Sequence, residues 1–169
     1  MKQLHCPNCG TPFVRVTCQE GPVERLLNRM RMFSFRCQLC TNQFRAFRSS
    51  PRLSSQAFDR RQYKRLPASI EVQFLADNRL RSTNRITDLS MDGCTLQSNE
   101  LPKGTFLELV LKPTSETEPI RVETAMVCTV RPSSVGLHFV EIPPADRQRL
   151  RQVVLGLLVS QTHHHVPSA

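Results

Sequence analysis

The segment ASIEVQFLA, residues 68–76, alternates apolar and polar side chains along its length. Ile70, Val72 and Phe74 therefore lie on one face of an extended chain, where they can pack into a core, while the residues between them face water. A period of two is typical of a half-buried β-strand. The segment predicts the first strand of a β domain and identifies its inward face.

Strand-like runs of similar length follow this segment and are separated by turn-forming residues. Such spacing is typical of an antiparallel barrel or sandwich, and we favour a mainly β fold built on a six-stranded antiparallel β-barrel. The runs are RLRSTNRITDLS (79–90), GCTLQS (93–98), TFLELVLK (105–112), IRVETAMVCTV (120–130) and VGLHFVEI (135–142).

The pattern changes in ADRQRLRQVVLGLLVSQ, residues 145–161, where apolar residues recur at helical spacing. This period predicts a C-terminal α-helix after the barrel. The helix either packs on its own domain or pairs with a second copy to form a homodimer. The end of the chain, residues 161–169, is polar and rich in histidine, and we expect a disordered tail there. The residues that recur at this spacing are Leu150, Val153, Val154, Leu157 and Leu158.

Four of the seven cysteines form two CxxC pairs near the N-terminus: Cys6, Cys9, Cys37 and Cys40. Each pair lets two thiolates converge on one tetrahedral ion, and short strand-like runs flank both pairs. The arrangement resembles a zinc ribbon, with a helical or looped insert at residues 18–32. Four thiolates leave no open position for water, so we expect structural Zn²⁺. Two redox-active pairs are the alternative.

Positive charge is concentrated in the first 65 residues. The chain has a formal net charge of +9, but the 104 residues after position 65 are nearly neutral. A polyanionic partner would therefore meet residues 1–65, although the charge can also serve solubility alone. Arginines and phenylalanines interleave in the zinc-ribbon-like module, where they suit either nucleic-acid binding or a small apolar core with a charged surface.

The sequence predicts two folded parts joined by a polar linker. We expect a zinc-ribbon-like module at residues 1–47, a linker at 48–58, and the barrel with its helix at 59–160. The sequence lacks the roughly 18 to 20 consecutive apolar residues of a membrane helix, and its start lacks the apolar core of a signal peptide. We therefore expect a cytoplasmic protein.

Two short motifs lie near the start of the β domain. FDRRQYKR (58–65) contains an RxxxR pattern, and DLSMDG (88–93) contains a DxSxxG pattern. Further on, VGLHF (135–139) places a glycine three residues before a phenylalanine. In this order the motifs resemble those of the PilZ domain, the bacterial receptor module for cyclic diguanylate (c-di-GMP). The resemblance covers about residues 58–160 and implies a β-barrel with a trailing helix.

The resemblance implies that the motif residues bind c-di-GMP. Arginine forks match both phosphate oxygens and the O6/N7 edge of guanine, and a carboxylate accepts hydrogen bonds from guanine N–H groups. The position before RxxxR is linked in the family to binding one ligand or a stacked pair, and here it is a planar cation, so we expect two molecules per chain. The predicted ligand-binding residues are Arg60, Arg61, Arg65, Asp88, Ser90 and Gly93.

These features together predict a second-messenger receptor that switches. Ligand would draw the RxxxR linker onto the barrel and change how the zinc-ribbon-like module is held, which would signal to a downstream protein. The alternative is a zinc-ribbon nucleic-acid-binding regulator whose β domain is regulatory or dimerising. We do not expect an enzyme, because the sequence has no open metal site, no Ser/His/Asp arrangement and no phosphate-cradling glycine loop.

Overall fold

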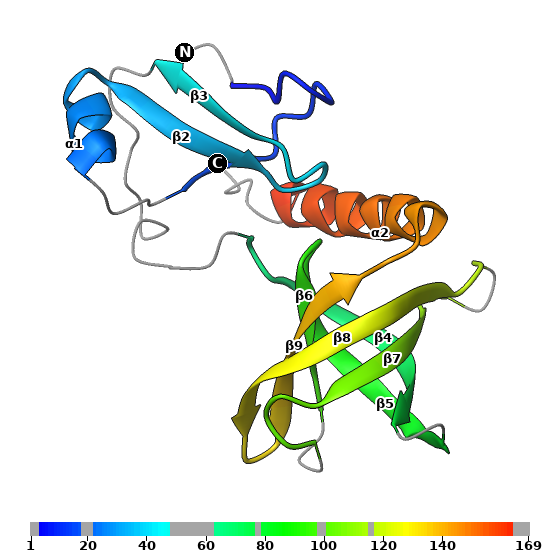
Figure 1. Ribbon diagram of the computed structural model, residues 1–169. Coiled ribbons are helices and arrows are strands. Elements are labelled where there is room, and N and C mark those ends of the chain that lie inside the picture. Colours follow the sequence, from blue (N-terminus) through cyan, green and yellow to red (C-terminus); the bar gives the residue numbers. More distant parts are fainter. Residues whose placement is uncertain are drawn as a thin grey trace, which may run out of the picture. The chain divides into compact units, whose positions relative to one another are not determined.

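The chain forms two compact units, residues 1–64 and 65–169. Figure 1 shows their strands and helices in a computed structural model. The structure describes residues 4–17, 22–47, 63–76, 79–97, 101–114 and 117–163.

Six antiparallel strands close the barrel of the second unit in the order β4–β5–β6–β9–β8–β7 (Figure 1). This confirms the predicted six-stranded antiparallel β-barrel. The strands are β4 (Leu66–Ala76), β5 (Arg79–Leu89), β6 (Gly93–Leu96), β7 (Phe106–Lys112), β8 (Ile120–Arg131) and β9 (Ser134–Glu141).

The core of the barrel is made of buried apolar side chains from every strand. Val72 and Phe74, on the face of β4 that the sequence predicts to be inward, are 0% and 2% exposed. Burying an aliphatic or phenyl side chain of this size stabilises a fold by about 1.5–3 kcal/mol. The barrel therefore has a core large enough to keep its outer face rigid. The other strands add Ile86, Leu96, Leu109, Val122 and Leu137.

Helix α2 (Pro144–His163) packs on the barrel of its own unit, in contact with β4 and β8. Leu150, Val154 and Leu158, spaced four residues apart, form its buried stripe. Asp146 fixes the first turn of the helix, because its Oδ1 accepts hydrogen bonds from the Arg121 N–H at 3.1 Å and from Arg149 Nη1 at 2.8 Å. The sequence left two placements open for this helix: packing on its own domain or pairing with a second copy. The structure shows the helix packed on its own barrel.

The predicted domain limits stay predictions. The predicted linker, residues 48–58, lies outside the described residues. Helix α2 continues to His163, and so enters the stretch 161–169 that was expected to be a disordered tail. Residues 164–169 are outside the described part of the chain.

The first unit contains a three-stranded antiparallel sheet in the order β1–β2–β3, with one helix before β2 (Figure 1). Phe35 on β2 is 1% exposed, and its ring stacks on Phe44 of β3 with the ring centroids 5.8 Å apart. A core of this size is small for an independent fold. The elements are β1 (Val14–Val16), α1 (Pro22–Arg29), β2 (Met32–Cys37) and β3 (Gln43–Phe47), so the predicted insert at 18–32 contains a helix.

Among the described residues, no helix is both long and apolar enough to cross a membrane.

Gly93 allows strands β6 and β9 of the barrel to approach each other. It begins β6 and pairs with His138 of β9. A Cβ atom built on Gly93 would lie 2.1 Å from the backbone oxygen of Leu137, a distance that no side chain can occupy. Any residue other than glycine must therefore push β6 away from β9.

We predict that Gly93→Ala lowers the free energy of unfolding of the barrel by at least about 2 kcal/mol, because it forces this pairing apart. Urea denaturation of the full chain, followed by circular dichroism, measures the change. Gly156→Ala is the matched control: nothing lies within 4 Å of the added methyl group, and alanine favours the helix by about 0.5–1 kcal/mol. Equal stability of the Gly93→Ala variant and the unmodified chain would contradict this account.

Candidate functional site

Arg65 and Asp88 meet on the surface of the barrel. Arg65 directly precedes β4, and its Nη1 donates to Oδ1 of Asp88, near the end of β5, at 3.2 Å. Thr95 on β6 donates through Oγ1 to the same Asp88 oxygen at 3.0 Å and accepts a hydrogen bond from Arg65 Nη1. The Arg65 and Asp88 side chains are 25% and 30% exposed. A pair this open stabilises a fold by at most about 1 kcal/mol, so its groups can exchange partners with a ligand at low cost.

A row of paired residues crosses four neighbouring strands under this guanidinium group: Asp88, Thr95, Gly136 and Thr129. A methyl group built on Gly136 would lie 3.4 Å from Thr129 Cβ and 3.7 Å from Arg65 Nη2. The guanidinium group therefore reaches from the Asp88 carboxylate to a position over Gly136. A side chain at this position would touch the guanidinium group, so glycine leaves this side of the cation without a side-chain neighbour.

Ser90 holds the turn between β5 and β6. Its N–H and its Oγ both donate to the backbone oxygen of Gly93, at 2.9 and 3.0 Å, and its Oγ accepts from the Asp92 N–H at 3.3 Å. The residue is 4% exposed. A hydroxyl has one donor and two acceptor positions, so Ser90 Oγ keeps one acceptor position. It can take a hydrogen bond from a ligand N–H but has no proton left for a phosphate oxygen.

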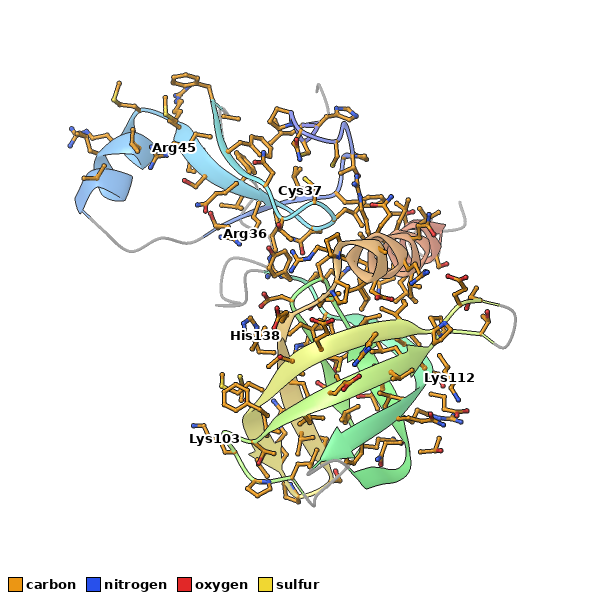
Figure 2. The ribbon with its side chains drawn as sticks, turned by 45° about the vertical axis from the view of Figure 1, so that its right-hand side comes forward. Arg36, Cys37, Arg45, Lys103, Lys112 and His138 are labelled. Atoms are coloured by element: carbon orange, nitrogen blue, oxygen red, sulfur yellow. The ribbon has the colours of Figure 1, made fainter. Side chains whose placement is uncertain are left out.

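The same turn is fixed to β9 through Asp92. The backbone oxygen of Asp92 accepts a hydrogen bond from the Phe139 N–H at 2.9 Å. His138 Nδ1 lies 3.1 Å from that oxygen and 3.3 Å from Asp92 Oδ2 (Figure 2). Because both neighbours are acceptors, Nδ1 carries a proton. The turn is thus held from two sides, which keeps Asp88 and Gly93 in a fixed relation.

The structure describes four of the six predicted ligand-binding residues. Arg65 and Asp88 are brought into contact, whereas Ser90 and Gly93 lie in the adjoining turn. The other two, Arg60 and Arg61, lie outside the described residues. Sequence reasoning missed Thr95, although a threonine in the otherwise apolar run GCTL was a signal that its hydroxyl has a polar partner. It also missed Thr129, which carries no local signal because a register shift in β8 decides its direction.

The four predicted metal ligands lie together in the first unit. Their sulfur atoms all lie within 4.8 Å of one another, and the closest pairs are Cys6–Cys40 at 3.5 Å and Cys9–Cys37 at 3.6 Å. A tetrahedral ion with metal–sulfur distances of about 2.3 Å places its sulfurs about 3.8 Å apart. The cluster therefore has the size and the donor set to hold one metal ion.

The backbone around both CxxC turns suits thiolate ligands. The N–H groups of Leu39 and Cys40 each point to Cys37 Sγ at 3.4 Å. Gly10 and Thr41 directly follow the two turns and have positive φ angles of 70° and 63°. This conformation curls the chain around each sulfur pair. Its occurrence at Thr41, where it costs more than at glycine, indicates that the second turn is firmly held.

The thiols of this cluster differ in their affinity for protons. Burial raises the pKa of Cys37 to about 12, although the backbone N–H groups of Cys40 and Leu39 act in the opposite direction. Burial also acts to raise the pKa of Cys40, but hydrogen bonds, led by one from the Asn8 side chain, lower it to about 6. A cation at the centre of the cluster would stabilise all four thiolates and release the protons.

A closed six-stranded barrel, with a helix after its last strand and an arginine–aspartate pair at its surface, defines a known class of domain. Residues 59–156, more than half of the chain, match the PilZ domain family. The chain therefore belongs to the PilZ domain family. No curated protein matches the chain.

Solved structures share this fold. The PilZ domain with c-di-GMP of YcgR from Escherichia coli is 18% identical, with a TM-score of 0.50 over 64% of this chain and 100% of that one. YcgR from Escherichia coli in complex with c-di-GMP is 16% identical, with a TM-score of 0.52 over 89% and 76%. The Bacillus subtilis inhibitor of motility (MotI/DgrA) is 19% identical, with a TM-score of 0.51 over 78% and 72%.

Proposed function

We propose that the chain is a non-catalytic receptor for c-di-GMP. The observation that carries the proposal is the contact between Arg65 of the RxxxR motif and Asp88 of the DxSxxG motif, beside Gly136. Membership of the PilZ domain family supports it. Two structures of the same fold, both of YcgR, contain this dinucleotide, which adds support.

The chemistry of each group suggests its role. Arg61 and Arg65 bind phosphate oxygens or the O6/N7 edge of guanine through their planar forks. Among the described residues no group donates to Oδ2 of Asp88, so this oxygen accepts from a guanine N–H. Ser90 accepts one further N–H, and Gly93 contributes by letting β6 pair closely with β9 beside the site. Arg60 stacks on a second guanine, and two c-di-GMP molecules bind per chain.

Ligand binding acts as a latch in this proposal. The dinucleotide draws the RxxxR segment onto the barrel and changes the placement of the cysteine-containing unit, which presents a different surface to a downstream protein. A homodimer through α2 would use its exposed Leu155 and Val159. The cytoplasmic location expected from the sequence stays a prediction.

The metal in the cysteine cluster is structural Zn²⁺ in this account. Four thiolates suit zinc and leave no position for a substrate. The small core around Phe35 and Phe44 makes the first unit dependent on it. Zinc in small zinc-finger peptides supplies about 10–16 kcal/mol of folding free energy, which is more than such a core supplies.

Nucleic-acid binding by the first unit is the second candidate. Arg45 and Phe47 lie two residues apart on the exposed face of β3, and Phe47 is 70% exposed. An exposed ring next to a cation is suited to stack on a base near a phosphate. In this reading the barrel regulates a nucleic-acid-binding zinc ribbon, and binding would weaken steeply with salt.

We predict that c-di-GMP binds the full chain with a stoichiometry of two, and that Arg61→Ala, Arg65→Ala or Asp88→Ala weakens binding about 10- to 100-fold. Each substitution removes a charge-assisted hydrogen bond, worth about 1.5–3 kcal/mol. Isothermal titration calorimetry measures both quantities, and Arg60→Leu is expected to reduce the stoichiometry to one.

Arg147→Ala, which removes an exposed arginine from α2, is the matched control and should bind as the unmodified chain does. A flat titration with the unmodified chain would refute the receptor and favour the nucleic-acid reading. One ligand per chain, unchanged by Arg60→Leu, would refute only the stacked pair.

We also predict that a zinc chelator unfolds the first unit and leaves the barrel folded, because only the first unit depends on the metal. Backbone chemical shifts of the full chain report each unit separately. Cys37→Ser should lose zinc and give the same result, whereas Cys128→Ser, outside the cluster, should keep both zinc and shifts. Unchanged shifts of residues 4–47 after chelation would show that the unit folds without metal.

A further inference from the structure

The second CxxC turn holds a residue of the RxxxR motif. Gln38 lies between the metal ligands Cys37 and Cys40, and its Oε1 accepts a hydrogen bond from the Lys64 N–H at 2.7 Å. Gln38 is 7% exposed, and its Nε2 also approaches the Arg36 backbone oxygen at 3.5 Å. Its amide is therefore fixed within the turn that carries the metal ligands.

A second contact holds the neighbouring residue, Tyr63. Arg36, next to Cys37 on β2 (Figure 2), donates through Nη1 to the Tyr63 hydroxyl at 3.1 Å. The Arg36 guanidinium carbon also lies 5.6 Å from the centre of the tyrosine ring, a cation–π distance. Nη2 of the same arginine donates to Gln43 Oε1 at 3.2 Å, which fixes its direction. Tyr63 is 5% exposed.

Both contacts are made to residues inside the RxxxR motif. Tyr63 and Lys64 are two of the three residues between Arg61 and Arg65. The cysteine-containing unit therefore fixes the interior of the motif whose two ends are the proposed ligand contacts. Both fixing groups are adjacent to Cys37, so their positions depend on the fold that the metal maintains.

We propose that metal binding at the cysteine cluster and c-di-GMP binding at the barrel are positively coupled through Gln38 and Arg36, which act as positioning residues for the RxxxR motif. The proposal deepens the receptor function above and rests on it. With metal bound, residues 63 and 64 are already ordered, so the ligand does not have to order them when it binds. Without metal, the same segment must be ordered at the expense of ligand affinity.

The coupling is reciprocal by thermodynamic linkage. If metal raises the affinity for c-di-GMP by some factor, c-di-GMP raises the affinity for metal by the same factor. The metal-bound unit holds two residues that would otherwise have to be ordered when c-di-GMP binds. We therefore expect metal to raise the affinity for c-di-GMP by a factor of at least about 10. The unit would thus make the receptor responsive to zinc depletion or to oxidation of its thiols, both of which remove the metal.

Calorimetry of c-di-GMP binding to the full chain tests the proposal in four states: zinc-loaded and chelator-treated, each with and without Gln38→Ala. We expect chelation to weaken binding at least tenfold. Gln38→Ala should weaken binding several-fold while zinc remains bound, as a chromogenic zinc assay can verify. In the chelated protein Gln38→Ala should change nothing further, because the turn that positions Gln38 is already lost.

Asn42→Ala is the matched control, since it also removes a side-chain amide close to Cys40 but breaks no contact with residues 63 and 64. It should bind zinc and c-di-GMP as the unmodified chain does. Tyr63→Phe, which removes only the hydroxyl that Arg36 contacts, should weaken binding less than Gln38→Ala does. Zinc affinity measured with and without c-di-GMP should rise by the factor seen in the first experiment.

The outcomes separate this inference from the receptor function. Binding by the zinc-loaded chain, with equal affinity after chelation and after Gln38→Ala, would overturn the coupling and leave the receptor intact. Tighter binding after chelation would also overturn it, because the metal would then hold the motif away from the ligand. No binding in any state would instead refute the receptor itself.

Discussion

β6 and β9 are neighbouring strands of the closed barrel, and their pairing requires Gly93 to have no side chain. β6 is only four residues long, so one displaced residue would disturb much of its contact with β9. Together with the pairing of β5 and β6, it aligns Asp88, Thr95 and Gly136 across three neighbouring strands. The arginine–aspartate contact thus rests on a surface that the core holds rigid, while the contact itself is weak enough for a ligand to replace.

The two units reach stability by different means. In the barrel, buried residues of six strands and three turns of α2 form a continuous apolar core. The first unit has the Phe35–Phe44 stack and four cysteines whose sulfurs are gathered to the size of one metal ion. A fold that depends on a metal can be lost under conditions that leave a hydrophobic core unchanged. This difference allows one unit to respond to its surroundings while the other keeps the ligand surface.

Much of the fold could be predicted from the sequence because its signals are local. The alternation around Val72 predicts a strand, and the CxxC spacing predicts a shared ion. The row of paired residues from Asp88 to Thr129 could be predicted only in part, because Thr129 joins it through a register shift in β8. The hydrogen bond from Lys64 to Gln38 joins residues 26 positions apart and has no sequence signature. Lys64 makes this contact through its backbone N–H, which no side-chain pattern reports.

A map of amide chemical-shift changes, recorded when c-di-GMP is added to the zinc-loaded full chain, locates the ligand on the protein. We expect the largest changes at Arg65, at residues 88–95, and at Gly136, where the residues of the motifs meet. Changes centred instead on the polar pocket lined by Glu71, Arg85 and Gln97 would contradict this expectation, because that pocket contains none of the motif residues.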